Sequence, residues 1–321
     1  MKNLLHSATA NILPFLLQAK KKQHVSILTY HRVLPAADWM RPVEPIVSDF
    51  EWQMELLSQH FNPVSLSDAL AMLEYGELPD RAVCVTFDDG YANNEECALP
   101  ILKKFGIPAT VFVATDFLNG GRMWNDTVIE ALRVAEGEVL DLVGMGLDKY
   151  PIRDITERRK AAGIIIREIK HWPPEKRAEA VNAIESMVDP LPEGMMMTDG
   201  QVISLKNNGI EIGAHTKSHP ILSTLGLNQV RDEVVESKNY LEDLLGTEVK
   251  YFAYPNGRPG IDYRMEHRDI VEIAGFEAAV STNWGVASSL SDKWQLPRFT
   301  PWDNTPLRFM IRLLLNYRNP A

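Results

Sequence analysis

Short apolar, β-branched runs recur along this chain, and most of them are separated by helical patterns. The runs with the length and composition of buried strands are 25–30, 82–88, 109–114, 210–215, 249–254, 276–281 and 295–299. Apolar residues at helical spacing predict helices after Ser48 and Ser67 and at 94–105, 199–208, 227–245, 263–274 and 305–317. Strands without a polar face that alternate with helices are typical of a parallel sheet. The pattern therefore predicts an α/β fold, a distorted (β/α)7 barrel.

The alternation breaks between residues 117 and 198, where a polar loop, helical stretches and a Trp-Pro-Pro sequence occur. We interpret this part as a helical insertion on the rim of the barrel, with a separate small domain as the alternative. The expected organisation is an N-terminal helical segment (1–23), a barrel with its insertion (24–304) and a C-terminal amphipathic helix (305–321).

The composition indicates a globular protein and excludes some classes of partner. Hydrophobic residues make up 45% of the chain and the formal net charge is -10. Because phosphate recognition needs concentrated Lys and Arg, we expect no nucleic-acid partner. Only two cysteines occur, Cys84 and Cys97, which is not the pattern of a disulfide scaffold. The first residues lack the pattern of a signal peptide, so we expect a cytoplasmic protein.

The N-terminal segment combines apolar residues with a run of lysines, Lys20 to Lys22. A helix docked on the barrel is the favoured interpretation, and a membrane-surface helix is the alternative. No stretch reaches the roughly 20 apolar residues that span a bilayer. Any membrane association would therefore be peripheral, through this N-terminal helix.

Two adjacent carboxylates, Asp88 and Asp89, follow an apolar strand in the sequence TFDDG. Catalytic groups of a parallel barrel lie at the carboxyl ends of its strands. Burying neighbouring carboxylates is costly unless a cation or hydrogen bonds compensate. Since consecutive strand residues point in opposite directions, one Asp could bind a metal while the other acts as a base. The alternative is a turn or helix-capping pair.

Two histidines, His215 and His219, end another apolar strand in the sequence GAHTKSHP. With Asp89 they make a set of two imidazoles and one carboxylate, which leaves a coordination position open for water. That is the catalytic rather than the structural arrangement for zinc. The sequence therefore predicts a divalent metal bound by these three residues, Zn²⁺ ahead of Co²⁺ or Ni²⁺, and a hydrolytic reaction.

Two further strand ends carry candidate polar groups. His31 ends the first strand in LTYHRV, where a hydrogen-bonded structural histidine is the alternative. The sequence YFAYPNG, residues 251–257, ends in a turn that could present a backbone N–H to a developing oxyanion. Taken alone, this second motif is an ordinary turn.

Together, TFDDG, HTKSH and FAYPNG resemble the motifs of the NodB-type polysaccharide deacetylases, in the order that this family uses. The resemblance extends from about residue 24 to 300. It implies that Asp88 is the catalytic base and that Asp89, His215 and His219 are the metal ligands.

The sequence departs from the usual family pattern at two places. Ala253 and Tyr254 stand where an Arg usually precedes the proline of the third motif, and no late Leu-x-His motif supplies the general acid. The YHRV sequence resembles the start of a circularly permuted branch that includes poly-N-acetylglucosamine deacetylases, which implies that His31 is the acid. Arg298 in LPRF is a candidate replacement for the missing Arg, orienting Asp88.

The implied activity is metal-dependent hydrolysis of N-acetyl groups on an amino sugar in a polysaccharide or its precursor, with acetate as a product. The backbone N–H of Asn256 would stabilise the oxyanion. One alternative is a glycosidase, although the carboxylates of Asp88 and Asp89 are expected to diverge. The other is a non-catalytic carbohydrate-binding or assembly protein on the same fold. Candidate sugar-stacking residues, for which a core position is the alternative, are Trp124, Trp284, Trp294 and Trp302.

Overall fold

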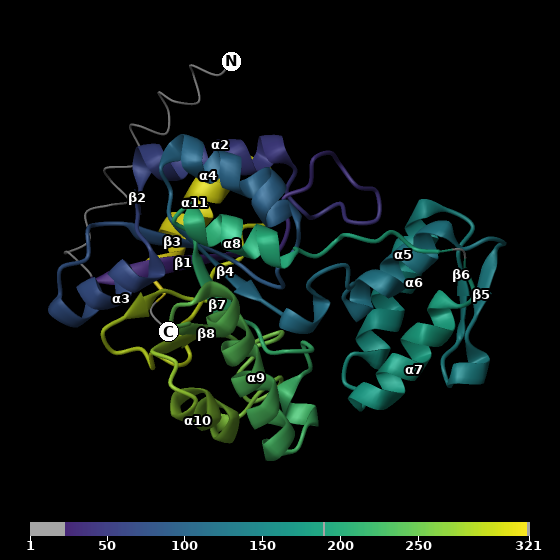
Figure 1. The fold of residues 1–321 in the computed structure, drawn as a ribbon. Helices are drawn as coiled ribbons and strands as arrows, with labels where there is room; N and C mark the ends of the chain where they lie inside the picture. Colours follow the sequence, from purple (N-terminus) through teal and green to yellow (C-terminus); the bar gives the residue numbers. More distant parts are fainter. Residues whose placement is uncertain (1–22, 189, 320–321) are drawn as a thin grey trace, which may run out of the picture.

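A curled, mainly parallel sheet forms the centre of the computed structural model, which describes residues 23–188 and 190–319 (Figure 1). Its strands are β1 (His24–Tyr30), β2 (Asn62–Pro63), β3 (Ala82–Phe87), β4 (Ala109–Val113), β7 (Glu211–Ala214), β8 (Tyr251–Ala253), β9 (Ala278–Val280) and β10 (Ala287–Ser288). They are ordered β10-β1-β3-β4-β7-β8-β9, with β2 beside β3 and only β10 antiparallel to its neighbour. The predicted fold class, a distorted α/β barrel, is confirmed. The predicted N-terminal helix lies outside the described residues.

The segment predicted as a seventh strand, residues 295–299, forms two isolated bridges instead of a strand. Leu296 bridges the end of β9, and Phe299 bridges β1, each through two backbone hydrogen bonds. Pro297 lies between them and has no N–H, so a continuous ladder cannot form. The gap between the two ends of the sheet is therefore closed by a kinked segment, and the prediction of a strand here was wrong.

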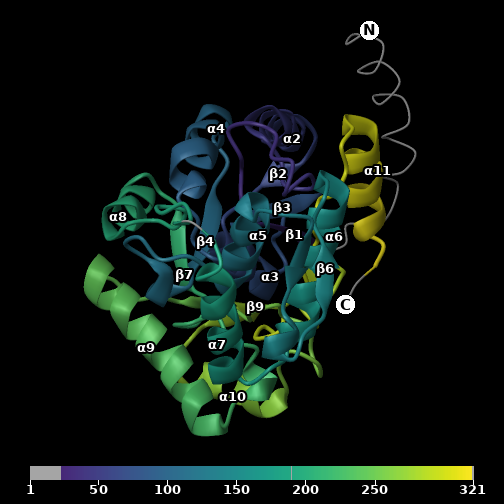
Figure 2. The same ribbon diagram turned by 90° about the vertical axis from the view of Figure 1, so that its right-hand side faces the viewer.

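Helices surround the sheet on its outer face (Figure 2). They are α2 (Val47–His60), α4 (Leu99–Phe105), α8 (Asp199–Asn207), α9 (Leu227–Leu245), α10 (Met265–Ile273) and α11 (Pro306–Asn316), whereas α3 (Leu66–Tyr75) packs against the inner residues of the sheet. The helix predicted at 227–245 has those bounds, whereas the one predicted at 94–105 starts with a π-helical turn, Asn94–Ala98. In the part of the chain that the structure describes, no helix has the length and apolar character needed to cross a membrane.

The interior of the barrel is filled by alternate strand residues. Val25 and Ile27 of β1 and Cys84 of β3 pack inward with residues of α3, whereas their sequence neighbours pack outward against the helices. Space inside is tight at Gly213, where a Cβ atom would overlap the ring of Phe112. The barrel ends are thus fixed by close packing, which gives the loops after the strands a rigid base.

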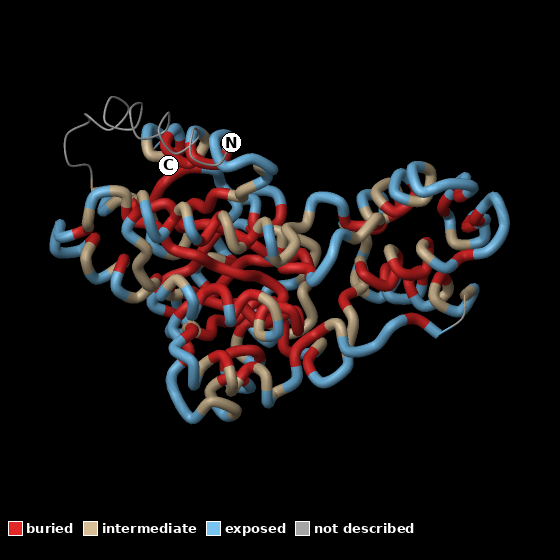
Figure 3. Tube along the Cα trace, turned by 90° about the horizontal axis from the view of Figure 1, so that it is seen from above, coloured by how far each residue is buried: buried red, intermediate tan, exposed pale blue. Residues whose placement is uncertain are grey.

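Most of residues 117–198 fold into a lobe that projects from the barrel (Figure 1). The lobe contains α5 (Trp124–Val134), α6 (Ile155–Ile169), α7 (Pro174–Glu185), and a hairpin of β5 (Val139–Asp141) and β6 (Lys149–Pro151). Its buried residues, such as Val128, Ile165 and Ile184, form a core of their own (Figure 3). The hairpin was not predicted, because its strands are only three residues long and one of them ends in proline.

A buried ionic network attaches the lobe to the barrel. Asp126 of α5 accepts hydrogen bonds from Arg32 (3.3 Å), Arg41 (2.6 Å) and the Tyr91 hydroxyl (2.8 Å), and it is 1% exposed. Arg41 also pairs with Glu130 at 2.5 Å. Opposite charges and hydrogen bonds compensate for the burial of these groups. The network therefore fixes α5 against the loop that follows β1.

We predict that Asp126→Ala lowers the free energy of unfolding by about 3–5 kcal/mol, because it leaves two guanidinium groups buried without this carboxylate. Urea unfolding followed by circular dichroism measures the change. Lys104→Ala is the matched control, since Lys104 forms an exposed pair with Glu51 and should leave the unfolding midpoint nearly unchanged. Equal changes in the free energy of unfolding for the two substitutions would show that the buried network stabilises the fold no more than an exposed ion pair does.

Candidate active site

Three potential metal ligands converge at the carboxyl ends of β3 and β7. The Oδ1 atom of Asp89 lies 3.4 Å from Nε2 of His215 and 3.4 Å from Nε2 of His219. The donor atoms of the three residues all lie within 4.8 Å of one another. Ligand atoms about 2.1 Å from a tetrahedral zinc ion are about 3.4 Å apart, so the spacing suits a single ion of this kind.

The hydrogen bond of His215 and the protonation of His219 and Asp89 also fit metal binding. Burial lowers the pKa of His215, but its hydrogen bond with Asp89 raises it above the usual value, so a metal ion would have to displace a proton there. Nδ1 of His215 donates to the carbonyl oxygen of Ala253 at 2.7 Å, which turns the Nε2 lone pair toward Asp89. Burial lowers the pKa of His219 to about 3; Asp89 opposes this shift, and the charges of His215 and Arg177 add to it. Burial alone would raise the pKa of Asp89, but the histidines hold it well below its usual range. A neutral His219 and an ionised Asp89 are the forms that bind a divalent ion.

The metal-site motifs contain strained backbone. Asp89, Thr216, His219 and Asn256 have φ angles of 75°, 62°, 52° and 58°, in the left-handed region that L residues rarely adopt. They are four of the six non-glycine residues with positive φ in the described chain, and Thr216 is β-branched. Because Asp89 leaves the extended conformation, its carboxylate need not point away from that of Asp88. Such strain is typical of functional sites and persists only where the surroundings enforce it.

Asp88 is bound by a bidentate ion pair with Arg298. Its two carboxylate oxygens accept from Nη1 at 2.7 Å and Nη2 at 2.6 Å, and both side chains are buried. The guanidinium is oriented by a further bond from Nε to the carbonyl oxygen of Ser281 at 2.9 Å. Burial would raise the pKa of Asp88, but the charges of Arg298 and then His215 lower it below its usual range. Asp88 is therefore ionised at neutral pH.

The other two predicted residues lie in loops at the same end of the sheet as this cluster. His31 is exposed at the end of β1, and its charge lies close enough to contribute to lowering the pKa of Asp88 and Asp89. Asn256 lies in the turn after β8, where its carbonyl accepts from the Thr282 hydroxyl at 2.8 Å. No described residue accepts a hydrogen bond from its backbone N–H. This N–H is thus available to a ligand.

Glu233 of α9 is a site residue that the sequence analysis missed. Its carboxylate accepts from the backbone N–H groups of Lys217 (2.9 Å) and Ser218 (2.8 Å), so it fixes the loop that carries His219. A signal for it exists, because Glu233 lies on the helix face of the buried Val230. An acid on the buried face of a helix indicates a buried polar partner.

Glu44 is a second residue that the sequence analysis missed. It lies in the loop between β1 and α2, where burial raises the pKa of its carboxyl against the opposing charges of His31 and Arg32. The charge of Asp89 adds to the rise. No sequence pattern marks Glu44, because the loop has no periodicity.

The four candidate sugar-stacking tryptophans have different surroundings. Trp124 is half-buried and lines a cavity between the lobe and the barrel. Trp294 packs on the main core, and its Nε1 donates to the carbonyl oxygen of Phe276 at 3.0 Å. Trp284 and Trp302 are 55% and 65% exposed beside Arg312. Of the four, Trp124 is therefore the one placed in a pocket.

Comparison with known proteins gives consistent matches. The sequence matches the family model described as polysaccharide deacetylase over residues 75–166 and 178–279, more than half of the chain. The Streptococcus pyogenes deacetylase PplD in complex with acetate has a similar structure, with a TM-score of 0.62 and 20% identity over 91% of this chain and 98% of PplD. For IcaB from Ammonifex degensii the TM-score is 0.57, with 20% identity over 90% of this chain and 95% of IcaB. At these identities the two structures show the shared fold.

A curated relative gives a similar result. The poly-β-1,6-N-acetyl-D-glucosamine N-deacetylase of Staphylococcus epidermidis is 22% identical over 220 residues, which are 60% of this chain and 72% of the relative.

We predict that His215→Ala and His219→Ala each lose bound divalent metal, because each removes one of three donor groups from the cluster. Elemental analysis after dialysis against a weak chelator measures the metal content. His171→Ala is the control, since His171 is exposed between α6 and α7. Full metal occupancy in the double variant of His215 and His219 would show that the ligand assignment is wrong.

Proposed function

This chain belongs to the polysaccharide deacetylase family, and we propose that it is a metal-dependent enzyme that hydrolyses the N-acetyl group of an amino sugar in a polysaccharide or its precursor. The observation that carries the proposal is the buried cluster of Asp89, His215 and His219 beside the ion pair of Asp88 with Arg298. A metal site next to an ionised, oriented carboxylate suits hydrolysis of an amide.

The metal would be held by Asp89, His215 and His219. A divalent ion bound there supplies Lewis acidity, which polarises the acetamide carbonyl and lowers the pKa of water. Two imidazoles and one carboxylate are ligands that zinc accepts readily, and Co²⁺ and Ni²⁺ accept the same set.

Asp88 acts as the general base. It is ionised, so it can accept a proton from the attacking water. Each carboxylate oxygen of Asp88 accepts one hydrogen bond from Arg298. The second lone pair of each oxygen remains to accept a hydrogen bond from the water. The low pKa of Asp88 also favours the release of that proton after each turnover. Arg298 orients the base and thereby replaces the arginine that usually precedes the proline of the third motif in this family.

His31 acts as the general acid, and Asn256 assists. As water oxygen adds to the carbonyl carbon, negative charge develops on the carbonyl oxygen, to which the Asn256 backbone N–H donates a hydrogen bond. His31 then protonates the sugar nitrogen while the C–N bond breaks. The products are acetate and a free amino group on the sugar. The side chain of His31 is exposed to solvent in the loop that follows β1.

The glycosidase alternative fits the site less well. A glycosidase needs one carboxylic acid that is still protonated when substrate binds. Here the pKa values of both Asp88 and Asp89 are lowered, and each carboxylate has cationic or imidazole partners. Neither is suited to be the protonated acid, whereas the deacetylase mechanism gives a role to every member of the cluster.

We expect acetate release from N-acetylglucosamine oligomers that stops when the metal is chelated and returns when Zn²⁺ or Co²⁺ is added. Acetate assay and elemental analysis of the same samples measure this, with the double alanine variant of His215 and His219 as the inactive control. Bound metal without release would point to a different acyl substrate. Neither metal nor release would favour a non-catalytic protein.

His31→Ala should lower kcat about 10²–10⁴-fold, because the departing nitrogen loses its proton donor, while metal content stays near that of the wild type. Steady-state kinetics and elemental analysis measure the two quantities. Loss of the metal together with the activity would refute the role of His31 as an acid and make it a ligand instead.

A further inference from the structure

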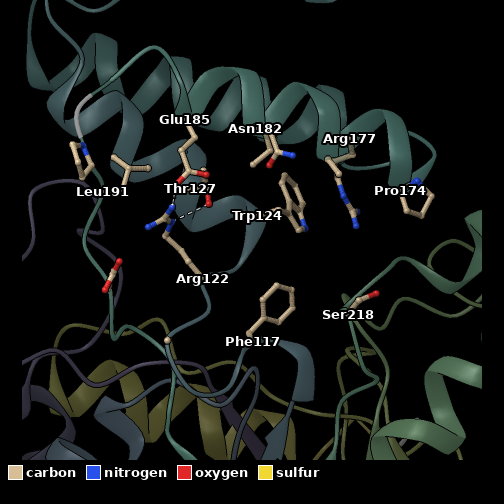
Figure 4. A pocket seen from close by; sticks show the side chains of 15 residues that line it. Phe117, Arg122, Trp124, Thr127, Pro174, Arg177, Asn182, Glu185, Leu191 and Ser218 are labelled. Atoms are coloured by element: carbon tan, nitrogen blue, oxygen red, sulfur yellow. Dashed lines mark hydrogen bonds and ion pairs between the residues drawn. The ribbon is translucent and has the colours of Figure 1, made fainter.

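A cavity of about 600 Å³ lies between the lobe and the barrel (Figure 4). On the lobe it is lined by Trp124 of α5 and by Arg177 and Asn182 of α7; on the barrel it is lined by Phe117 and Ser218. The volume is in the range of small-molecule sites. Ser218 precedes the metal-ligand candidate at position 219, so the cavity shares a loop with the proposed catalytic centre.

Arg177 is a buried cation without a counterion. Four arginines are buried in the described chain, and three of them pair with buried aspartates: Arg32 and Arg41 with Asp126, and Arg298 with Asp88. Arg177 is only 7% exposed, yet within residues 23–188 and 190–319 it forms no ion pair and donates only to the carbonyl oxygen of Lys170, at 3.5 Å. A buried charge without a counterion is costly, which a bound anion would offset.

The surroundings of Arg177 direct its charge into the cavity. Its guanidinium lies over the ring of Trp124, 4.8 Å from the centroid, and Figure 4 shows it pointing into the open space between α7 and Phe117. Glu233 is the acid whose charge acts on it, but that carboxylate already accepts hydrogen bonds from the loop at Ser218. Ser218, the neighbour of His219 in the chain, lines the same cavity as Arg177. The cation thus lies near the proposed metal cluster.

We propose that this cavity is a second sugar subsite, in which Arg177 binds an acidic group on a unit adjacent to the N-acetylated one. This inference rests on the proposed deacetylase function and names its substrate class, an acidic amino-sugar polymer or precursor. A guanidinium fork matches the oxygens of a carboxylate or a phosphate. Trp124 and Phe117 offer apolar faces to a sugar ring, and Asn182 and Ser218 offer hydrogen bonds to hydroxyl groups.

The test compares kcat/KM for three oligosaccharides of equal length. One is a neutral N-acetylglucosamine oligomer, one has a uronic acid next to the acetylated unit, and one has a phosphate-bearing unit there. The kcat/KM of the wild type should be at least about tenfold higher for one acidic oligomer than for the neutral one, chiefly through a lower KM. Which acidic oligomer is preferred shows whether the subsite binds a carboxylate or a phosphate. Arg177→Gln should abolish the preference, and Arg177→Lys should reduce it. Lys176→Gln, at an exposed neighbour outside the cavity lining, should retain it.

Two kinetic results would overturn the subsite. Deacetylation of the neutral oligomer without any preference for an acidic one would do so while leaving the deacetylase function intact. An equal fall on neutral and acidic oligomers in Arg177→Gln, with the ratio unchanged, would make Arg177 a structural residue.

A binding measurement separates this proposal from the deacetylase function. Calorimetric titration with deacetylated glucosamine–glucuronic acid and glucosamine–phosphate disaccharides should show binding of one of them to the wild type and to the double alanine variant of His215 and His219. That binding should weaken at least about tenfold in Arg177→Gln. Such a result supports the subsite even if no acetate is released. Failure of both disaccharides to bind the wild type would overturn it.

Discussion

The barrel and the site both depend on the ion pair of Asp88 with Arg298. This pair connects two residues that are 210 positions apart in the chain. Asp88 directly follows β3, and Arg298 belongs to the segment that closes the sheet through two backbone bridges. A buried carboxylate without this guanidinium would be protonated or would destabilise the fold. The pair therefore links the closing segment to the barrel, and it keeps the proposed base ionised and oriented.

The cluster of Asp89, His215 and His219 depends in turn on backbone conformations that the barrel enforces. Residues at the ends of β3, β7 and β8 adopt the left-handed region, which costs of order 1–3 kcal/mol each. Tight packing in the barrel and the bonds of Glu233 to the loop after β7 hold them there. Because the strands are parallel, these strained turns all lie at the same end of the sheet. Rigid strands with strained turns thus bring the three candidate ligands together.

The lobe contacts the proposed site as well as the barrel. Its α5 is attached by the buried network at Asp126 to Arg32, the neighbour of the proposed acid His31. Its α7 carries Arg177 toward the loop of His219. The lobe therefore contacts the site on two sides, through a charge-compensated network on one and an uncompensated cation on the other. A buried charge with a counterion suits a structural attachment, whereas a buried cation without one suits a site for an anionic ligand.

The sequence by itself determined the α/β class, most strands and helices, and the groups at strand ends that converge in the structure, because burial periodicity and strand-end motifs are local properties. Residue types and strand-end positions brought Asp89, His215 and His219 into one metal-site hypothesis, and the family resemblance implied the same ligands. The tertiary structure alone decided that Pro297 breaks the seventh strand and that Glu233 fixes the loop of His219. It also supplied the bidentate contact of Arg298 with Asp88, a partner that the sequence had only offered as a candidate. It also decided that Arg177 is buried without a counterion. These contacts join residues far apart in the chain, and periodicity reports which side of an element is buried but not what it is buried against.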